Sequence, residues 1–260
     1  MLWKDRVGVL VTALPRAEGL ALSRMISEND EDIECMVKKY DSGELLIDEL
    51  KLNIVQKAVK AAIDYRFAIF KGLFSHISTE QAKQIVKSSS IHSTIAEEER
   101  PSSLTYGEID FFSFSCILEK LNIIKGNSFV DLGHGTGRAL VCASFLYGDI
   151  LSSCVGIEIV PELYASSVDI ISRHEEIIQS DPMLCSAEDS PCRVRVIQGD
   201  ILQQDCDGFD WCAAGMRNFY LFVSCSIIHY GDMCIGNYLP VLNLYFPSLY
   251  ACFYIIFLQI

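Results

Sequence analysis

The spacing of apolar and polar positions changes along this chain and divides it into regions. From about residue 28 to 90, apolar residues recur at helical spacing, which predicts helices over Asp30–Tyr40 and Glu44–Phe74. Ser78 and Gln81 have the spacing of a capping box and predict the start of a further helix. These patterns predict a helical N-terminal region.

A polar connector follows this region. Ser88–Ser103 contains three consecutive serines, a Glu-Glu-Glu-Arg run and Pro101, a composition typical of a loop. We therefore expect residues 1–102 to form the helical region with its connector, residues 103–211 to form a second domain, and residues 212–260 to form a separate tail.

Beyond the connector, short apolar runs alternate with amphipathic segments. Ser128–Leu132, Cys154–Ile159 and Arg193–Ile197 are apolar runs that predict strands. Gly137–Tyr147 and Pro161–Gln179 have helical spacing between them. Because strands that alternate with helices pair in parallel, the predicted fold class is α/β, with a Rossmann-like sheet behind a helical N-terminal region.

A glycine-rich turn joins the first predicted strand to the helix after it. Gly133, Gly135 and Gly137 permit a tight turn and a close approach of a ligand, and the helix that follows offers free amide groups to a ligand carboxylate. The dinucleotide fingerprint Gly-x-Gly-x-x-Gly is not matched, because Arg138 or Leu140 stands at its third position. The pattern indicates a cofactor site, but not one for a nicotinamide dinucleotide.

Acidic residues lie at the ends of the predicted strands. Asp131 suits a ligand with positive charge, such as the sulfonium and amino groups of S-adenosylmethionine. Glu158 can accept hydrogen bonds from two ribose hydroxyls, and Asp200 can accept one from an adenine amino group. We therefore predict S-adenosylmethionine as the cofactor. His134, inside the turn, is expected to be a tolerated side chain at the pocket edge and not a general base.

The order of these motifs resembles one known family. TYGEIDF at Thr105–Phe111, then FVDLGHGTGR, GIE and GD together look like the catalytic domain of the disruptor-of-telomeric-silencing family, the histone-lysine methyltransferases without a SET domain, within the class I methyltransferases. The resemblance covers about Ser103–Asp205 and implies a Tyr-Gly-Glu loop that closes over the cofactor. It implies as cofactor-binding residues Tyr106, Gly107, Glu108, Ile109, Phe129, Asp131, Gly133, Gly135, Gly137, Arg138, Glu158, Asp200 and Ile201.

The chain departs from the family pattern at two places. Arg138 stands where the best-studied members carry Gln, so its contact with the cofactor is expected to differ. The Asn-aromatic motif that lines the methyl-transfer channel has its nearest counterpart in Asn218 and Phe219. The resemblance thus implies Tyr106 and Asn218 as catalytic residues. The implied reaction is displacement of the methyl group by a lysine amine, which the site must keep neutral by desolvation.

Composition and charge narrow the possible partners. The chain has 34 acidic against 21 basic residues, a net charge of -13 and no dense basic run, which argues against a generic nucleic-acid surface. Its 11 cysteines form no Cys-x-x-Cys pair, so we expect reduced thiols and no metal site. The N-terminus has no credible cleavage site, so an intracellular protein is expected, in the nucleus by resemblance. The expected partner is a protein with a target lysine, such as a histone in a nucleosome; a membrane is not expected.

The end of the chain breaks the alternation of strand and helix. No charged residue follows Asp232, and Pro240 and Pro247 interrupt the apolar run, leaving it shorter than the roughly 20 residues that span a membrane. Too few residues follow Asp210 to supply the further strands and helices of such a sheet. We therefore expect residues 212–260 to be a truncated or divergent tail, with poor cofactor binding and weak or absent lysine methylation as the consequence.

Three functions remain open at the level of the residues. The first is a protein-lysine methyltransferase directed to histones. The second is a methyltransferase that acts on another protein or on a small molecule, and the third is a catalytically incomplete cofactor-binding protein. The acceptor, the number of methyl groups added and the oligomeric state are left undetermined.

Overall fold

The structure is a computed structural model, and it describes residues 3–89, 107–121, 123–184, 192–199, 218–223 and 254–259, the last two ranges as backbone alone. Contacts divide the chain into two units, Met1–Ile69 with Asp181–Ser186 and Phe70–Ser180 with Ala187–Ile260. The first division falls within helix α4 (Ile47–Leu73). The predicted boundary at residues 102 and 103 lies outside the described residues and stays a prediction.

The first unit is helical. It contains α1 (Trp3–Val11), α2 (Arg16–Ser27), α3 (Glu31–Asp41) and the first part of α4. Helix α3 begins where the sequence predicts, because the Asp30 carboxylate accepts hydrogen bonds from the backbone of two residues in its first turn. Helices α1 and α2 precede the region for which the apolar spacing predicted helices.

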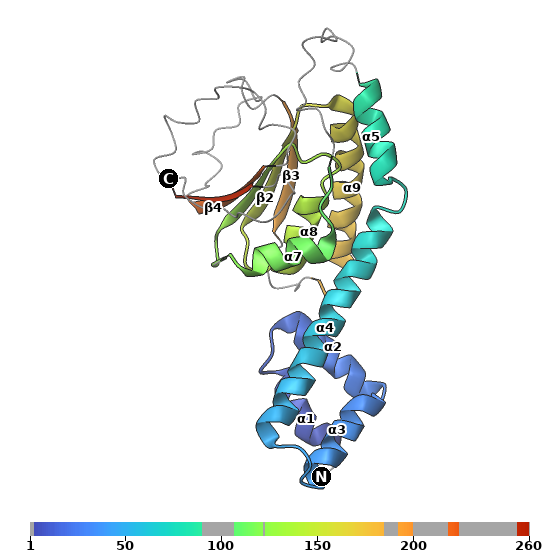
Figure 1. The fold of residues 1–260 in the computed structure, drawn as a ribbon, viewed down its shortest axis with the longest axis vertical. Coiled ribbons are helices and arrows are strands. Elements are labelled where there is room, and N and C mark those ends of the chain that lie inside the picture. Colours follow the sequence, from blue (N-terminus) through green and yellow to red (C-terminus); the bar gives the residue numbers. More distant parts are fainter. Residues whose placement is uncertain are drawn as a thin grey trace. The chain divides into compact units, whose positions relative to one another are not determined.

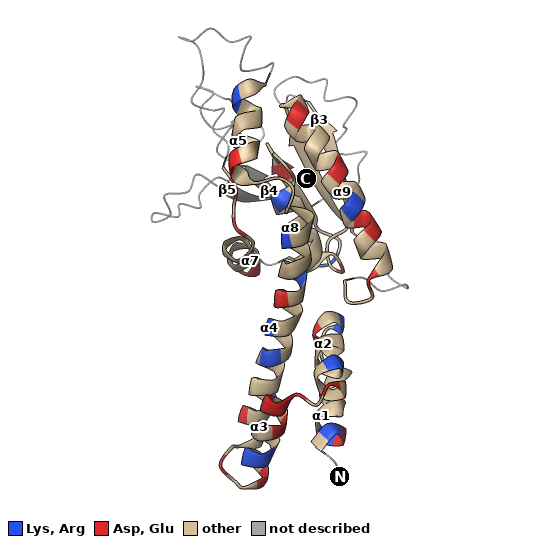
Figure 2. Cartoon of the chain, turned by 90° about the vertical axis from the view of Figure 1, so that its right-hand side faces the viewer, with Lys and Arg blue, Asp and Glu red and all other residues tan. Residues whose placement is uncertain are grey.

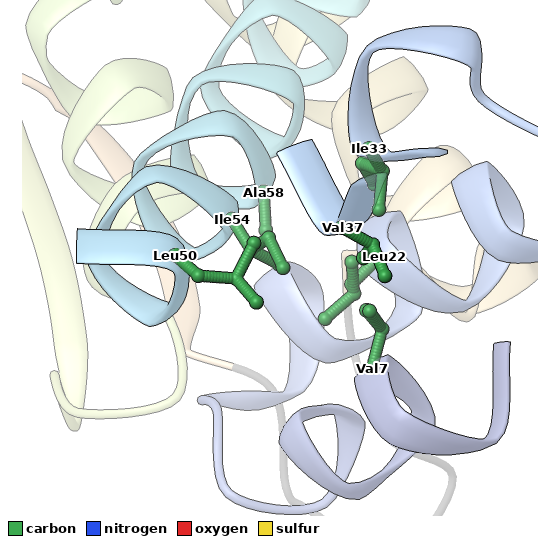
Figure 3. Close-up of a cluster of buried hydrophobic side chains, with 7 residues drawn as sticks. All are labelled: Val7, Leu22, Ile33, Val37, Leu50, Ile54 and Ala58. Atoms are coloured by element: carbon green, nitrogen blue, oxygen red, sulfur yellow. The ribbon is translucent and has the colours of Figure 1, made fainter. Parts of the chain in front are cut away.

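The core of the helical unit is assembled from all four helices (Figure 3). Each helix buries an apolar stripe that it could not bury alone, which is why the four helices pack together. The buried cluster consists of Val7, Leu22, Ile33, Val37, Leu50, Ile54 and Ala58.

Charged side chains of this unit are interspersed and paired. Figure 2 shows both basic and acidic side chains on α3 and on α4. The Lys57 ammonium lies 3.0 Å from a carboxylate oxygen of Asp30 and 2.5 Å from one of Asp32. Lys57, and likewise Lys60 with Asp64, are thus paired with acidic side chains and do not form a free basic surface.

The second unit is built on a five-stranded sheet with the order β3-β2-β1-β4-β5. The first four strands are parallel, and β5 is antiparallel to β4. The strands are β1 (Ser128–Leu132), β2 (Ser153–Glu158), β3 (Arg193–Gln198), β4 (Asn218–Val223) and β5 (Tyr254–Gln259). The helices of this unit, beside the end of α4, are α5 (Thr79–Ser88), α7 (Phe111–Glu119), α8 (Arg138–Tyr147) and α9 (Pro161–Ser180).

The α/β prediction is confirmed, and the three predicted strands lie within one residue of their expected bounds. All five residues of β1 are buried, as expected of a strand near the middle of a parallel sheet. The capping box is also confirmed, since the Ser78 hydroxyl accepts from the Gln81 backbone and the Gln81 side chain accepts from the Ser78 backbone. Helices α8 and α9 pack on the sheet beside one another (Figure 1).

The tail contributes two strands to this sheet. Strand β4 pairs in parallel with β1, from Ser128 opposite Phe219 to Leu132 opposite Val223, and β5 pairs with β4. Sequence analysis did not predict these strands, and the expectation that residues 212–260 are not the native completion of the domain stays a prediction. No helix in the described part of the chain is both long and apolar enough to cross a membrane.

The strand order positions a binding site. The chain passes from β1 to β2 to β3 in one direction, and β4 then lies on the opposite side of β1. At such a reversal the two connecting segments diverge and leave a crevice at the carboxyl ends of the strands. The glycine turn follows the carboxyl end of β1 and therefore lies at this switch point.

Candidate functional site

The turn after β1 depends on its glycines. Gly133, Gly135 and Gly137 have φ values of 75°, 57° and 89°, the left-handed region that side chains with a Cβ disfavour. Gly137 precedes the first residue of α8 as its N-cap, and its amide donates to the His134 carbonyl at 2.8 Å. The conformational reason for the predicted glycines is confirmed, and their contact with a cofactor stays a prediction.

Two buried carboxylates lie at the base of this turn. Asp131 is 2 % exposed and Glu158 is 4 % exposed. One Glu158 oxygen accepts from the Gly135 amide at 2.7 Å, and the other accepts from the Val160 amide at 2.9 Å. Glu158 therefore braces the glycine turn against the end of β2. It was predicted as a ribose partner, and each oxygen keeps a second lone pair for such a role.

The buried carboxylate of Asp131 has little to offset its loss of contact with water. Its Oδ1 atom is buried and has no hydrogen-bond partner within the part of the chain that the structure describes. Burial, together with repulsion from Glu158, raises the pKa of Asp131 well above its usual value. Burial also raises the pKa of Glu158, although its backbone donors oppose that shift. The site thus holds acidic groups whose ionised forms lack a counter-charge.

This arrangement favours one class of ligand. A buried acceptor without a partner is destabilising, and a bound cation that donates to it removes that cost. The first amides of α8 point toward the same turn and favour an anion. The residues therefore fit a ligand that carries an ammonium or sulfonium group and a carboxylate, as S-adenosylmethionine does.

His134 is buried within the turn, and its expected place at a pocket edge stays a prediction. Burial lowers its pKa to about 3, so the imidazole is neutral at physiological pH, and neither ring nitrogen has a hydrogen-bond partner among the described residues. Gly156 on β2 makes room for this ring. An alanine Cβ at that position would lie 2.5 Å from Leu140 Cδ1 and closer still to the His134 ring. The need for Gly156 comes from residues distant in sequence, so no local pattern indicates it.

Glu108 is held by two side chains from other elements. Arg138 Nε lies 2.9 Å from Glu108 Oε1, and the Thr79 hydroxyl donates to Glu108 Oε2. The Arg138 guanidinium lies over the Phe74 ring, 4.5 Å from its centroid, and donates to the Ile77 carbonyl at 3.2 Å. Glu108 was predicted to line the cofactor pocket, and the structure places its carboxylate on Arg138 and Thr79.

The remaining predicted residues are placed in different ways. Phe129 on β1 is buried, and its ring packs edge to face with Phe114, with centroids 5.8 Å apart. Gly107 is exposed and Ile109 is half-buried, directly before α7. Asn218 is the first residue of β4 and is described as backbone alone. Tyr106, Asp200 and Ile201 lie outside the described residues, so the structure does not test their roles.

The described cysteines are free thiols. Cys154 on β2 and Cys192 before β3 are buried, with their sulfur atoms 3.5 Å apart, and burial raises the pKa of Cys154 well above its usual value. Within the ranges that the structure describes, no group of three or more His, Cys, Asp or Glu side chains is arranged to hold a metal ion.

Comparison with protein families matches part of this chain. Residues 85–178 match the family model described as "Histone methylation protein DOT1". The matched segment runs from the end of α5 through α9 and includes Glu108, the glycine turn and Glu158. The resemblance to the disruptor-of-telomeric-silencing family is thereby confirmed. No curated protein matches the chain.

Several solved structures are similar to parts of the chain. The YcgJ protein from Bacillus subtilis is 13% identical with a TM-score of 0.27, and the match covers 44% of this chain and 51% of that protein. YjhP from E. coli is 16% identical with a TM-score of 0.27, covering 55% and 56%. A SAM-dependent methyltransferase from Thiobacillus denitrificans, in complex with S-adenosyl-L-homocysteine, is 14% identical with a TM-score of 0.24, covering 53% of each chain. The chain thus spans about half the length of these neighbours.

Proposed function

We propose that this chain, whose residues 85–178 match the DOT1 histone methylation family model, is a member of that family, binds S-adenosylmethionine and methylates a lysine amine. The proposed acceptor is a histone, and the proposed compartment is the nucleus. The family match supports both of these proposals, and the glycine turn and Glu158 within the matched segment support cofactor binding.

One observation supports cofactor binding most directly. The unpartnered carboxylate oxygen of Asp131 is buried at the switch point of the sheet, next to a second buried acid, Glu158. Such a pair is unfavourable in the empty protein and becomes favourable when a cationic ligand supplies the missing donor. A nicotinamide dinucleotide has no protonated amine that could donate to Asp131, whereas S-adenosylmethionine carries both an ammonium and a sulfonium group.

Within the site, each part has a proposed task. Asp131 accepts from the amino group of the ligand, and Glu158 accepts from the ribose while it holds the Gly135 amide in place. The amides at the start of α8 receive the ligand carboxylate. We further propose that Tyr106, Gly107 and Ile109 cover the cofactor. Asp200 and Ile201 would bind the adenine, and Phe129 would pack beneath the turn.

S-adenosylmethionine held here would supply a methyl group: a neutral lysine amine would bond to the methyl carbon as the carbon–sulfur bond breaks, leaving S-adenosylhomocysteine and, after loss of a proton to water, the methylated amine. The chain then needs to align the amine with the methyl group and to exclude water, and it needs little acid or base chemistry. His134 is unsuited to proton transfer, because it is buried and its pKa is about 3. We propose that Tyr106 and Asn218 flank the acceptor channel.

Calorimetry with S-adenosylmethionine tests the binding step. Wild type is expected to bind, Gly135→Val is expected to abolish binding because a Cβ at a φ of 57° distorts the turn, and Glu158→Ala is expected to weaken it by about 1 to 3 kcal/mol. Gly72→Ala is the matched control, since its Cβ meets nothing within 4 Å and the residue lies in α4. Equal affinity in all four proteins would contradict the site.

A turnover assay separates the proposed reaction from its alternatives. Wild type is incubated with labelled cofactor and with nucleosomes, free histones or a panel of other proteins and small amines. Methylation of histone lysine supports the proposal, and methylation of another acceptor alone refutes the histone part. Binding without turnover on any acceptor would identify a cofactor-binding protein.

A further inference from the structure

The Glu108 carboxylate lies where two helices begin. Its Oε2 atom accepts from Thr79, the first residue of α5, and its Oε1 atom lies 2.9 Å from Arg138, the first residue of α8. The amino end of a helix carries a partial positive charge, so an anion near two such ends is favoured by both. Glu108 therefore has three sources of stabilisation, namely a cation, a hydroxyl donor and two helix termini.

The ion pair with Glu108 also stabilises Arg138. A cation in the first turn of a helix opposes the helix dipole, and Arg138 occupies the first position of α8. Its side chain is only 20 % exposed, and that of Glu108 is 9 % exposed, so solvent screens this ion pair less than it screens a surface pair. The stack on Phe74 and the bond to the Ile77 carbonyl fix the direction of the guanidinium.

We propose that Arg138 is a positioning residue, which holds Glu108 and so fixes the segment Gly107–Ile109 beside the glycine turn. The pair joins the first residue of α8, directly after the glycine turn, to the middle residue of the segment Gly107–Ile109. Arg138 thus preforms one wall of the cofactor site through Glu108, and Glu108 acts through its neighbours without itself binding the cofactor. This role rests on the proposed function only in its effect on cofactor affinity.

The first test needs no cofactor. The amides of Ser113 and Phe114, at the start of α7, are bonded to the Asp110 side chain and carbonyl, so their hydrogen exchange reports how firmly the preceding segment is held. In Arg138→Met, these amides are expected to exchange about tenfold faster than in wild type. Arg138→Lys, which keeps the charge, is expected to restore part of the protection.

The matched control is Arg24→Met on α2. Arg24 also forms an ion pair, 2.8 Å from Glu28, but this pair is more exposed and belongs to the helical unit. Exchange at Ser113 and Phe114 is expected to equal that of wild type in this variant. Unchanged exchange in Arg138→Met, or an equal increase in Arg24→Met, would overturn the positioning role.

The second test is a double-mutant cycle on cofactor affinity. Arg138→Met and Glu108→Gln are each expected to weaken binding of S-adenosylmethionine about tenfold, and the double variant is expected to be no weaker than about tenfold, because one pair is lost in every case. Losses that multiply to about a hundredfold would show that each residue contacts the cofactor by itself, contrary to the proposal.

The experiments distinguish a failure of the proposed function from a failure of the positioning role of Arg138. If wild type does not bind S-adenosylmethionine, the proposed function fails, and the exchange experiment still decides whether Arg138 holds the segment. If wild type binds and the cycle is additive, the proposed function stands and the positioning role is wrong. Thermal unfolding of each variant shows whether a change is local, since a folded variant keeps a cooperative transition near that of wild type.

Discussion

Replacing Asp131 by Asn is expected to stabilise the cofactor-free protein and to weaken cofactor binding. Asn has nearly the shape of Asp but no charge, so it removes the repulsion from Glu158 and the desolvation of a carboxylate that is 2 % exposed. Asn still leaves a polar group at this buried position, so only the charge-dependent part of the cost is relieved, and one unit of pKa shift corresponds to about 1.4 kcal/mol. We expect Asp131→Asn to raise the free energy of unfolding by about 1 to 2 kcal/mol at pH 8.

The pH dependence of stability predicts independently that Asp131→Asn is stabilising. The pKa of Asp131 is raised in the folded protein, so the folded state retains a proton that the unfolded chain releases above about pH 4. Stability from this group is therefore present at low pH and is lost as the pH rises through the folded pKa. The advantage of Asp131→Asn is expected to be small near pH 4, to grow with pH and then to level off.

Cofactor binding is expected to change in the opposite direction. A hydrogen bond to a charged group contributes about 1.5 to 3 kcal/mol, so loss of the Asp131 carboxylate is expected to weaken S-adenosylmethionine binding by about 10- to 100-fold. Urea unfolding between pH 5 and 8 and calorimetry measure the two effects. Asp149→Asn is the control, because Asp149 is exposed and its replacement is expected to change stability by less than about 0.5 kcal/mol. An Asp131→Asn protein that is less stable at every pH and binds the cofactor like wild type would refute this reasoning.

Two further predictions concern packing and buried histidine. Gly156→Ala is expected to destabilise the protein by about 1 to 3 kcal/mol, because the added Cβ collides with His134. Gly72→Ala in α4 is expected to stabilise the protein by about 0.5 to 1 kcal/mol. Thermal unfolding that ranks the two variants in another order would contradict the packing argument. Burial against Phe145 lowers the pKa of His174 to about 4, so His174 alone is expected to cost wild type about 1.6 kcal/mol of stability as the pH falls from 6.5 to 5, and His174→Phe is expected to lose less stability by that amount. Denaturant unfolding at both pH values checks this, and equal slopes in the two proteins would count against it.

The local elements of the fold could be predicted from the amino-acid sequence. Ser128–Leu132, the glycine turn and the start of α5 follow from apolar spacing, left-handed glycines and a capping box, and each depends on residues within a few positions of one another. The family resemblance was readable for the same reason, because its motifs are short and stand in a fixed order. The tail was harder, because an uncharged run with two prolines has no clear period, and β4 is defined by its pairing with β1.

The amino-acid sequence by itself determined which residues are available at the site, since it put Asp131, the three glycines and Glu158 at the ends of strands that had to be parallel. Only the tertiary structure decided how they are used. It placed Glu158 on the Gly135 amide, Glu108 on Arg138 and the His134 ring over Gly156. The physical reason is that these contacts join residues far apart in the chain, so they depend on how strands and helices pack and leave no local pattern.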